Sequence, residues 1–175
     1  MSDTESKLYL LDANVIIHAH DYYYNMARVP EFWGWILHHA ENSLIKMPIE
    51  TMDEVQGGPE AKHAQWIHSK SVKERLLFTE DFDESVLNHV VTTGYQLPSP
   101  NEDEIELMGQ DPFLIAHALV DPKRRIVISN ETSKPSAKGA KRKVPDVCKD
   151  LGVECYDIYH LLKALNFSTS WAGKL

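Results

Sequence analysis

Short apolar runs alternate with amphipathic stretches along the chain. Residues 7–12 (KLYLLD) form an apolar run that ends in an acid, which is typical of a buried parallel strand leading into a helix. Apolar positions at helical spacing within 31–43 predict an amphipathic helix that packs on this strand. Residues 44–47 predict a second strand, and Pro48 suits the first position of a helix running through Val55.

The middle of the chain, residues 60–106, has mainly helical patterns. We expect helices within 61–70 and 85–93, with a break at Pro98 and Pro100. After this segment, strands and helices alternate again. The elements expected there are a helix opened by Asp111 as N-cap and Pro112, a strand over 125–129, a polar loop to Lys143, a short helix from Pro145, a strand over 153–155 and a helix over 157–165.

This alternation predicts an α/β fold, in which helices flank a central parallel sheet and a helical insertion occupies the middle of the chain. The chain has 175 residues, 43% of them hydrophobic, which is enough for one core and does not require two. We therefore expect a single domain over residues 7–166, with flexible tails at 1–6 and 167–175.

The ends and the cysteines favour a cytoplasmic protein. Residues 1–6 are polar and do not resemble a signal peptide, and no apolar run approaches the roughly 20 residues that cross a bilayer. We expect no membrane partner. Cys148 and Cys155 lack the spacing of a zinc or redox motif, so we expect free thiols.

Positive charge is concentrated in one segment. The formal charge of −8 argues against a protein that coats nucleic acid without specificity. However, nine of the 18 basic residues lie between Asp121 and Lys149. Taken alone, this segment favours an ordinary solvated loop.

Acids occupy equivalent places in the predicted fold. Asp12 ends the first strand, Glu54 lies late in the helix after the second, Asp111 opens a helix, and Glu131 follows the 125–129 strand. Each alone is explained by a helix cap or a surface acid. Ligands of parallel sheets bind beyond the carboxyl ends of the strands, so these acids should meet there. Clustered carboxylates raise one another's pKa, and a hard divalent metal with activated water would resolve that conflict.

Four blocks of sequence resemble the motif blocks of the PIN-domain nucleases, in that order, and a fifth resembles one of their subfamilies. The first four run from Tyr9 to Ile17 (YLLDANVII), Met47 to Val55 (MPIETMDEV), Asp111 to Leu119 (DPFLIAHAL) and Ile126 to Glu131 (IVISNE). The fifth, KVPDVC at residues 143–148, resembles a toxin-like bacterial and archaeal subfamily. The resemblance implies a Rossmann-like, three-layer PIN-like domain and a ribonuclease that uses Mg²⁺ or Mn²⁺. It also implies that Asp12, Glu54, Asp111 and Glu131 are the catalytic metal ligands.

Two departures from the family pattern leave alternatives open. The last block has Ser129 and Glu131 where the family has threonine and aspartate, so Asp146 is an alternative or additional metal ligand. Glu50 lies one helical turn before Glu54 and competes with it. Asn14 and Ser129 are expected to position the acids by hydrogen bonds.

Beside these acids, the basic segment becomes a candidate RNA-binding surface, with Lys134, Lys138, Lys141 and Lys143 expected to hold the phosphate backbone. The tyrosines at 22–24 offer rings that could stack on bases, but we expect them to line the core. His18 and His20, together with His38 and His39 or with His63 and His68, would suffice for a zinc site, but nothing in the sequence fixes their geometry and we expect scattered surface or core imidazoles.

The sequence therefore predicts a metal-dependent endoribonuclease that acts on RNA. The resemblance suggests the toxin of a type II toxin–antitoxin pair, with an antitoxin partner and a homodimer, the latter through apolar residues of the 60–106 segment. The alternatives are an inactive PIN-fold binding module and a nuclease with a housekeeping role in RNA processing. A haloacid-dehalogenase-type phosphatase would need a second aspartate where the chain has Asn14.

Overall fold

A five-stranded parallel sheet forms the centre of the computed structural model, which describes residues 6–175. The strand order is β3-β2-β1-β4-β5, and each neighbouring pair is parallel. The strands are β1 (Leu8–Leu11), β2 (Ile45–Pro48), β3 (Leu77–Phe78), β4 (Arg125–Ile128) and β5 (Cys155–Tyr156).

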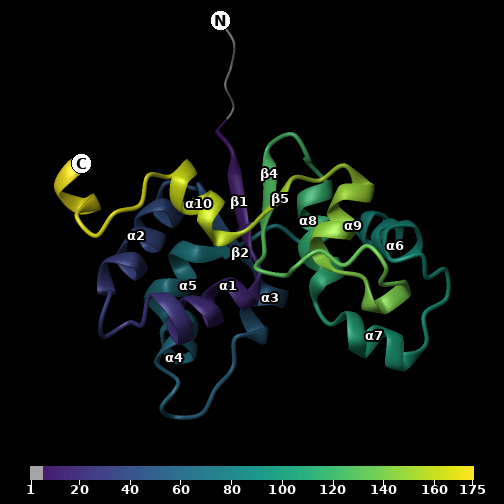
Figure 1. The fold of residues 1–175 in the computed structure, drawn as a ribbon, viewed down its shortest axis with the longest axis horizontal. Coiled ribbons are helices and arrows are strands. Elements are labelled where there is room, and N and C mark those ends of the chain that lie inside the picture. The colour runs from purple at the N-terminus through teal and green to yellow at the C-terminus, as the bar shows by residue number, and fades with distance from the viewer. Residues whose placement is uncertain (1–5) are drawn as a thin grey trace, which may run out of the picture.

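Helices cover both faces of this sheet, so the domain has three layers (Figure 1). Side chains alternate between the faces: Tyr9 and Leu11 of β1 belong to one apolar core and Leu10 to the other. The α-helices are α1 (Ala13–His18), α2 (Pro30–Glu41), α3 (Ile49–Glu54), α4 (Lys62–His68), α5 (Lys70–Leu76), α6 (Glu84–His89), α7 (Glu102–Met108), α8 (Asp111–Leu119), α9 (Val144–Leu151) and α10 (Ile158–Ala164). The short elements are the π-helices η1 (Ala19–Tyr23) and η2 (Val90–Gly94) and the 3₁₀-helices η3 (Gly139–Lys141) and η4 (Trp171–Lys174).

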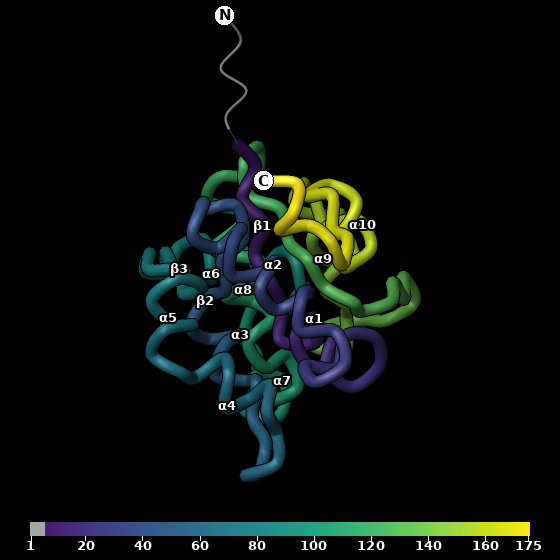
Figure 2. The backbone as a smooth tube through the Cα atoms, turned by 90° about the vertical axis from the view of Figure 1, so that its left-hand side faces the viewer, coloured from purple at the N-terminus to yellow at the C-terminus, as the bar shows by residue number. Residues whose placement is uncertain are grey.

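The predicted α/β class and the parallel sheet are confirmed, with one change in the middle segment. That segment is mostly helical, but it also supplies β3, which pairs with β2 at the edge of the sheet (Figure 2). Leu76 and Tyr95 are apolar residues of the 60–106 segment, which was expected to offer a dimer surface, and both are fully buried in the two cores. These two side chains are therefore core residues.

The two chain ends differ from each other. Of the tail predicted at 1–6, residues 1–5 lie outside the described part. Residues 167–175, predicted to be flexible, instead fold back on α2: Phe167 packs on the core, and the Trp171 indole donates a hydrogen bond of 2.8 Å to the Glu31 carbonyl. Two aromatic side chains bury apolar surface here, which the sequence pattern of this short end did not reveal.

Two further features follow from the structure. Cys148 is buried, Cys155 is partly buried, and both are free thiols, as predicted. Among residues 6–175, no helix has the length and apolar character needed to span a bilayer.

Candidate functional site

The site lies where the chain reverses its direction of travel across the sheet. β1 has β2 on one side and β4 on the other, so the connections that follow β1 and β4 diverge at this edge. Asp12 follows β1, and its amide donates to the Ile128 carbonyl at 2.9 Å. Such a divergence leaves a crevice beyond the carboxyl ends of the strands, which is where ligands bind in open α/β sheets.

Asp12 is held by the two residues predicted to position it. Its Oδ2 accepts hydrogen bonds from Ser129 Oγ at 2.6 Å and Asn14 Nδ2 at 2.7 Å. Asn14 Oδ1 in turn accepts a hydrogen bond from the backbone amide of Asn130 at 2.9 Å. Asp12 occupies the N-cap position of α1, yet its carboxylate makes no capping hydrogen bond to that helix. Its pKa is raised by burial and by Glu131, while Ser129 opposes the rise.

The structure separates Glu54 from its competitor Glu50. Glu54, at the end of α3, accepts a hydrogen bond from the backbone amide of Gln110 at 3.2 Å, next to the start of α8. Burial raises the pKa of this carboxyl and Asp12 adds to the rise, while the Gln110 amide lowers it. Glu50 instead lies 3.3 Å from His117 Nε2. Glu54 is therefore the acid that shares its surroundings with Asp12 and Asp111.

Asp111 is the first residue of α8, one position inside the N-cap predicted for it. Within residues 6–175, no donor hydrogen-bonds its carboxylate. Burial raises its pKa to about 8, with further contributions from Asp12, Glu131 and Glu54, and Lys143 opposes the rise. Four carboxylates from four segments thus act on one another electrostatically.

Glu131 and Asp146, the two candidates for the last acid, have different surroundings. Glu131 Oε1 lies 2.9 Å from Lys143 Nζ, and its Oε2 accepts from the Val144 amide at 2.8 Å at the start of α9. Asp146 is buried, and it accepts from Ser133 Oγ at 2.5 Å and from the Lys134 amide at 2.7 Å. Asp146 therefore anchors the basic loop, whereas Glu131 faces the other acids.

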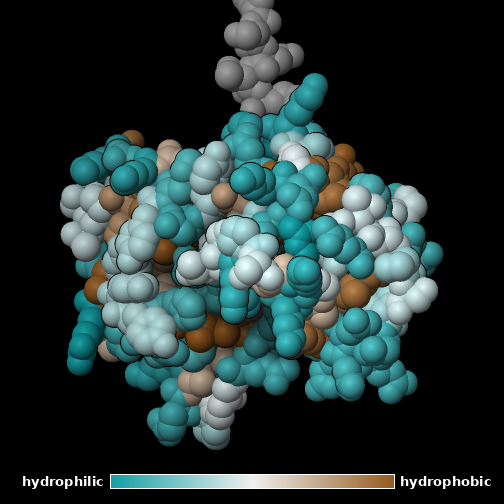
Figure 3. Space-filling model, turned by 45° about the vertical axis from the view of Figure 1, so that its right-hand side comes forward, coloured by the Kyte–Doolittle hydropathy of each residue, from teal (hydrophilic) through white to brown (hydrophobic). Residues whose placement is uncertain are grey.

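A cleft of about 800 Å³ joins the acids to the basic segment. Asp111 and Glu131 line it together with Lys134, Lys138, Lys141 and Lys143, the four lysines predicted to meet RNA. Figure 3 shows that hydrophilic residues cover most of the face carrying α7 and α9. Lys143 has a second role, since its ammonium pairs with Glu131.

β4 divides the nine basic residues into two groups. Lys123, Arg124 and Arg125 lie at the start of this strand, at the end of the sheet away from the acids. Arg125 there pairs with Glu80 at 2.6 Å. Of the group after the strand, Lys134, Lys138, Lys141, Arg142 and Lys143 line the cleft and Lys149 does not, so only part of the basic segment is available to the site.

The opposite wall of the cleft was not foreseen. Glu104 and Leu107 of α7 line it, and α7 ends at Gly109, whose φ is +55°. A Cβ on Gly109 would stand 3.1 Å from Glu54 Oε1. A glycine just before Gln110 and Asp111 is a recognisable helix stop, and that signal would have predicted the turn that brings Glu54 beside α8.

Two of the three neighbouring tyrosines are exposed, contrary to prediction. Tyr22 and Tyr23 are 69% and 52% exposed, and together with Tyr159 and Asn130 they line a second hollow of about 340 Å³. Tyr24 does pack inward, stacked on Phe32 with ring centroids 4.5 Å apart. Tyr22 and Tyr23 belong to the π-helix η1, whereas Tyr24 follows it with a non-helical backbone (φ −124°, ψ 54°), so no helical period relates its side chain to the other two.

The donor set of the site suits a hard divalent cation. Asp12, Glu54, Asp111 and Glu131 offer only oxygen, and their mutual repulsion is what an added cation would relieve. No three of these acids have ligand oxygens that all lie within 4.8 Å of one another among the residues described. Mg²⁺ retains several waters and needs only one or two direct carboxylates, so this wider spacing is compatible with it.

Comparison with known proteins places the chain in a family. A family model with the description "Domain of unknown function (DUF4411)" matches residues 9–169, which include every acid and lysine discussed above. No curated protein and no solved structure matches the chain.

Proposed function

The chain belongs to the DUF4411 family, and from the geometry of its site we propose that it is a metal-dependent ribonuclease that hydrolyses RNA phosphodiester bonds. Asp12, Glu54, Asp111 and Glu131 hold Mg²⁺ or Mn²⁺. Kinship with the PIN-domain nucleases, drawn from the motif blocks, is part of this proposal.

One observation carries the proposal: Asp111 and Glu131 open into the same cleft as four lysines. Acids alone would repel a polyanion, and lysines alone would bind it without a means of cleavage. A cleft that combines both can hold the phosphate backbone through its cations and present one phosphate to a metal-binding group.

Each side chain then has a distinct task. When bound, the divalent ion supplies an activated water and neutralises charge on the scissile phosphate. Asn14 and Ser129 keep the buried Asp12 carboxylate oriented through their hydrogen bonds. Lys134, Lys138 and Lys141 contact phosphates beside the cut.

Cleavage of a mixed pool of structured RNAs by the purified protein tests this function. We expect cutting with Mg²⁺ or Mn²⁺ that EDTA abolishes. Asp12→Asn should lose the activity, because an amide cannot replace the anionic ligand. Asp53→Asn is the matched control, since Asp53 is an exposed acid next to Glu54.

Two results would contradict the proposal. Cleavage that survives both EDTA and Asp12→Asn would point to a contaminating nuclease or to other chemistry. A folded protein that binds RNA and cuts none with any metal would be an inactive binding module.

The finer proposal, which rests on the subfamily resemblance, is a toxin whose antitoxin covers the acidic cleft. Induced expression of the wild type in a bacterial host should then arrest growth, and Asp12→Asn should relieve the arrest. Harmless expression of a chain that cleaves RNA in vitro would instead favour a housekeeping role in RNA processing.

A further inference from the structure

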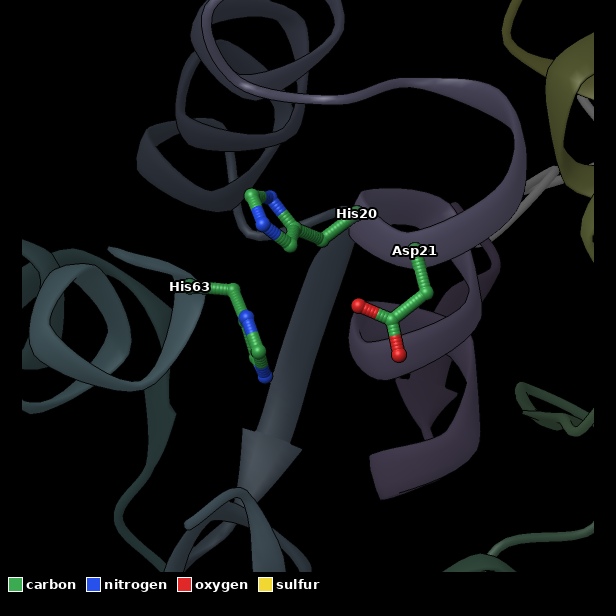
Figure 4. A group of neighbouring side chains, drawn as sticks. All are labelled: His20, Asp21 and His63. Carbon is green, nitrogen blue, oxygen red and sulfur yellow. The ribbon is translucent and has the colours of Figure 1, made fainter. Parts of the chain in front are cut away.

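Two imidazoles and a carboxylate meet outside the acidic cleft, between η1 and α4. His20 and Asp21 come from η1 and His63 from the start of α4, and their side chains face a common space (Figure 4). Each residue offers one ligand atom, and the three atoms all lie within 4.8 Å of one another. Within residues 6–175, no other group of three or more histidine, cysteine or acidic residues meets this spacing.

The imidazoles of this group have unmet hydrogen-bonding capacity. His63 is only 8% exposed, and its Nδ1 is buried without a partner. His20 Nδ1 is likewise buried and unpartnered, and the two ring centroids lie 4.7 Å apart. A buried polar atom without a partner costs free energy, and an ion is one of the few groups that satisfies two facing imidazoles at once.

Packing alone explains these residues less well. His39 Nδ1 is also buried and unpartnered, so a single such atom does not define a site. His20 and His63 differ from it because an acid, Asp21, stands beside them. Asp21 makes no hydrogen bond or ion pair with either ring in the described chain, so the carboxylate does not itself satisfy the imidazoles.

The spacing requires only small adjustments to hold an ion. Metal–nitrogen and metal–oxygen bonds of about 2.0–2.2 Å place two ligands on one ion at most about 4.4 Å apart. The present separations are all within 4.8 Å, so they exceed this limit by about 0.4 Å at most. Three protein ligands leave further positions for water, which suits the partly exposed side of the site.

We propose that His20, Asp21 and His63 bind a divalent transition-metal ion of the Zn²⁺ class, at a site separate from the acidic cleft. Imidazole nitrogen favours zinc and its neighbours over Mg²⁺, whereas the all-oxygen cleft has the opposite preference. The bound ion connects η1 to α4. The first of these elements follows α1, which Asp12 precedes, and the second follows α3, which ends at Glu54.

Zinc binding to the purified full-length chain tests this proposal. The protein is stripped of metal, placed in excess Mg²⁺ to occupy the acidic cleft, and titrated with Zn²⁺ against a chromophoric chelator. We expect one tightly bound Zn²⁺ per chain and a Zn²⁺-dependent rise in Tm. His63→Ala and Asp21→Asn should each weaken binding at least about tenfold, the lower end of what loss of even an indirect metal partner costs.

The controls separate this site from the cleft. His18→Ala removes a histidine of the preceding helix that packs on Tyr22, and it should bind Zn²⁺ as the wild type does. Asp12→Asn should also retain Zn²⁺ binding. Asp21 is exposed, so Asp21→Asn keeps the test decisive even if His63→Ala fails to fold.

Three outcomes would overturn the proposal: no Zn²⁺ binding by the wild type, unchanged binding in folded Asp21→Asn and His63→Ala, or binding that only Asp12→Asn removes. RNA cleavage in Mg²⁺ is measured independently, so failure here leaves the proposed nuclease function intact.

Discussion

Asp111 combines a half-buried carboxylate with three acidic neighbours. Its pKa is about 8, against an ordinary value of 3.8, so between these pH values the folded chain binds a proton that the unfolded chain has lost. The free energy of unfolding of the metal-free protein should therefore fall as pH rises from about 4 to about 8, by an amount on the order of a few kcal/mol. Urea unfolding in EDTA across this range measures it.

The variant Asp111→Asn tests the assignment, because it removes the group that titrates. Its stability should change less over the same pH range and exceed that of the wild type near pH 8. Mg²⁺ or Mn²⁺ should stabilise the wild type at pH 8 and have less effect on the variant. An unchanged slope in Asp111→Asn would move the titration to Asp12 or Glu54, whose pKa values are also raised.

Ser129 is the residue that links two of the proposed metal ligands. Its hydroxyl donates to Asp12 and accepts from the Glu131 amide at 3.2 Å. Ser129→Ala should cost about 1–3 kcal/mol of stability, because buried polar groups lose their partner. It should also weaken Mn²⁺ binding about 10- to 100-fold, which calorimetry measures. Ser168→Ala, at a partly exposed serine near the C-terminus and far from the acids in sequence, is the control, and equal losses in both variants would refute the link.

Between elements, the turn from α7 to α8 sets the position of Glu54. Gly109 has φ +55° and ψ −132°, a conformation that side chains disfavour, and a Cβ there approaches Glu54 Oε1. Gly109→Ala should destabilise the protein by about 1–3 kcal/mol and lower metal affinity by displacing Glu54. Gly58→Ala is the control, since nothing lies within 4 Å of its Cβ. Unfolding measures the stability and titration measures the Mn²⁺ affinity. A loss of stability with unchanged Mn²⁺ affinity would mean that Gly109 has a purely structural role.

The loop after β4 depends on one buried acid. Asp146 accepts hydrogen bonds from both Ser133 and Lys134. Asp146→Ala should therefore release the loop, with faster amide hydrogen exchange across residues 133–143.

The identity of the fourth metal ligand is a separate prediction. Glu131→Gln should weaken Mn²⁺ binding more than Asp146→Asn does, and the reverse order would make Asp146 the fourth ligand.

Across the whole molecule, the cleft predicts how RNA affinity depends on salt. Lys138→Ala and Lys141→Ala should each weaken RNA binding, and each should reduce the slope of log affinity against log salt by roughly 0.7 for single strands. Lys149→Ala is the matched control, because Lys149 belongs to the same basic segment but does not line the cleft. Equal effects from all three lysines would mean that RNA binds without using the cleft.

The sequence by itself determined the class of fold and the edge of the sheet at which the acids gather. Apolar runs and helical spacing report the burial of each local element, and they fixed β1, β2, β4 and most helices to within a few residues. Asp12 and Glu131 could be placed because each comes just after a strand, and parallel strands end at one edge. The two-residue strand β3 was not predicted, because its pairing with β2 is a long-range contact with no local signature in the sequence.

Only the tertiary structure decided which acids face one another and which cations reach them. Glu50 and Glu54 look alike in sequence, as do Glu131 and Asp146, yet their hydrogen-bond partners lie on other elements. The grouping of His20 and Asp21 with His63 likewise depends on the packing of α4 against η1. Spacing along the chain encodes the periodicity of a single element, whereas a site is built from side chains that distant segments bring together.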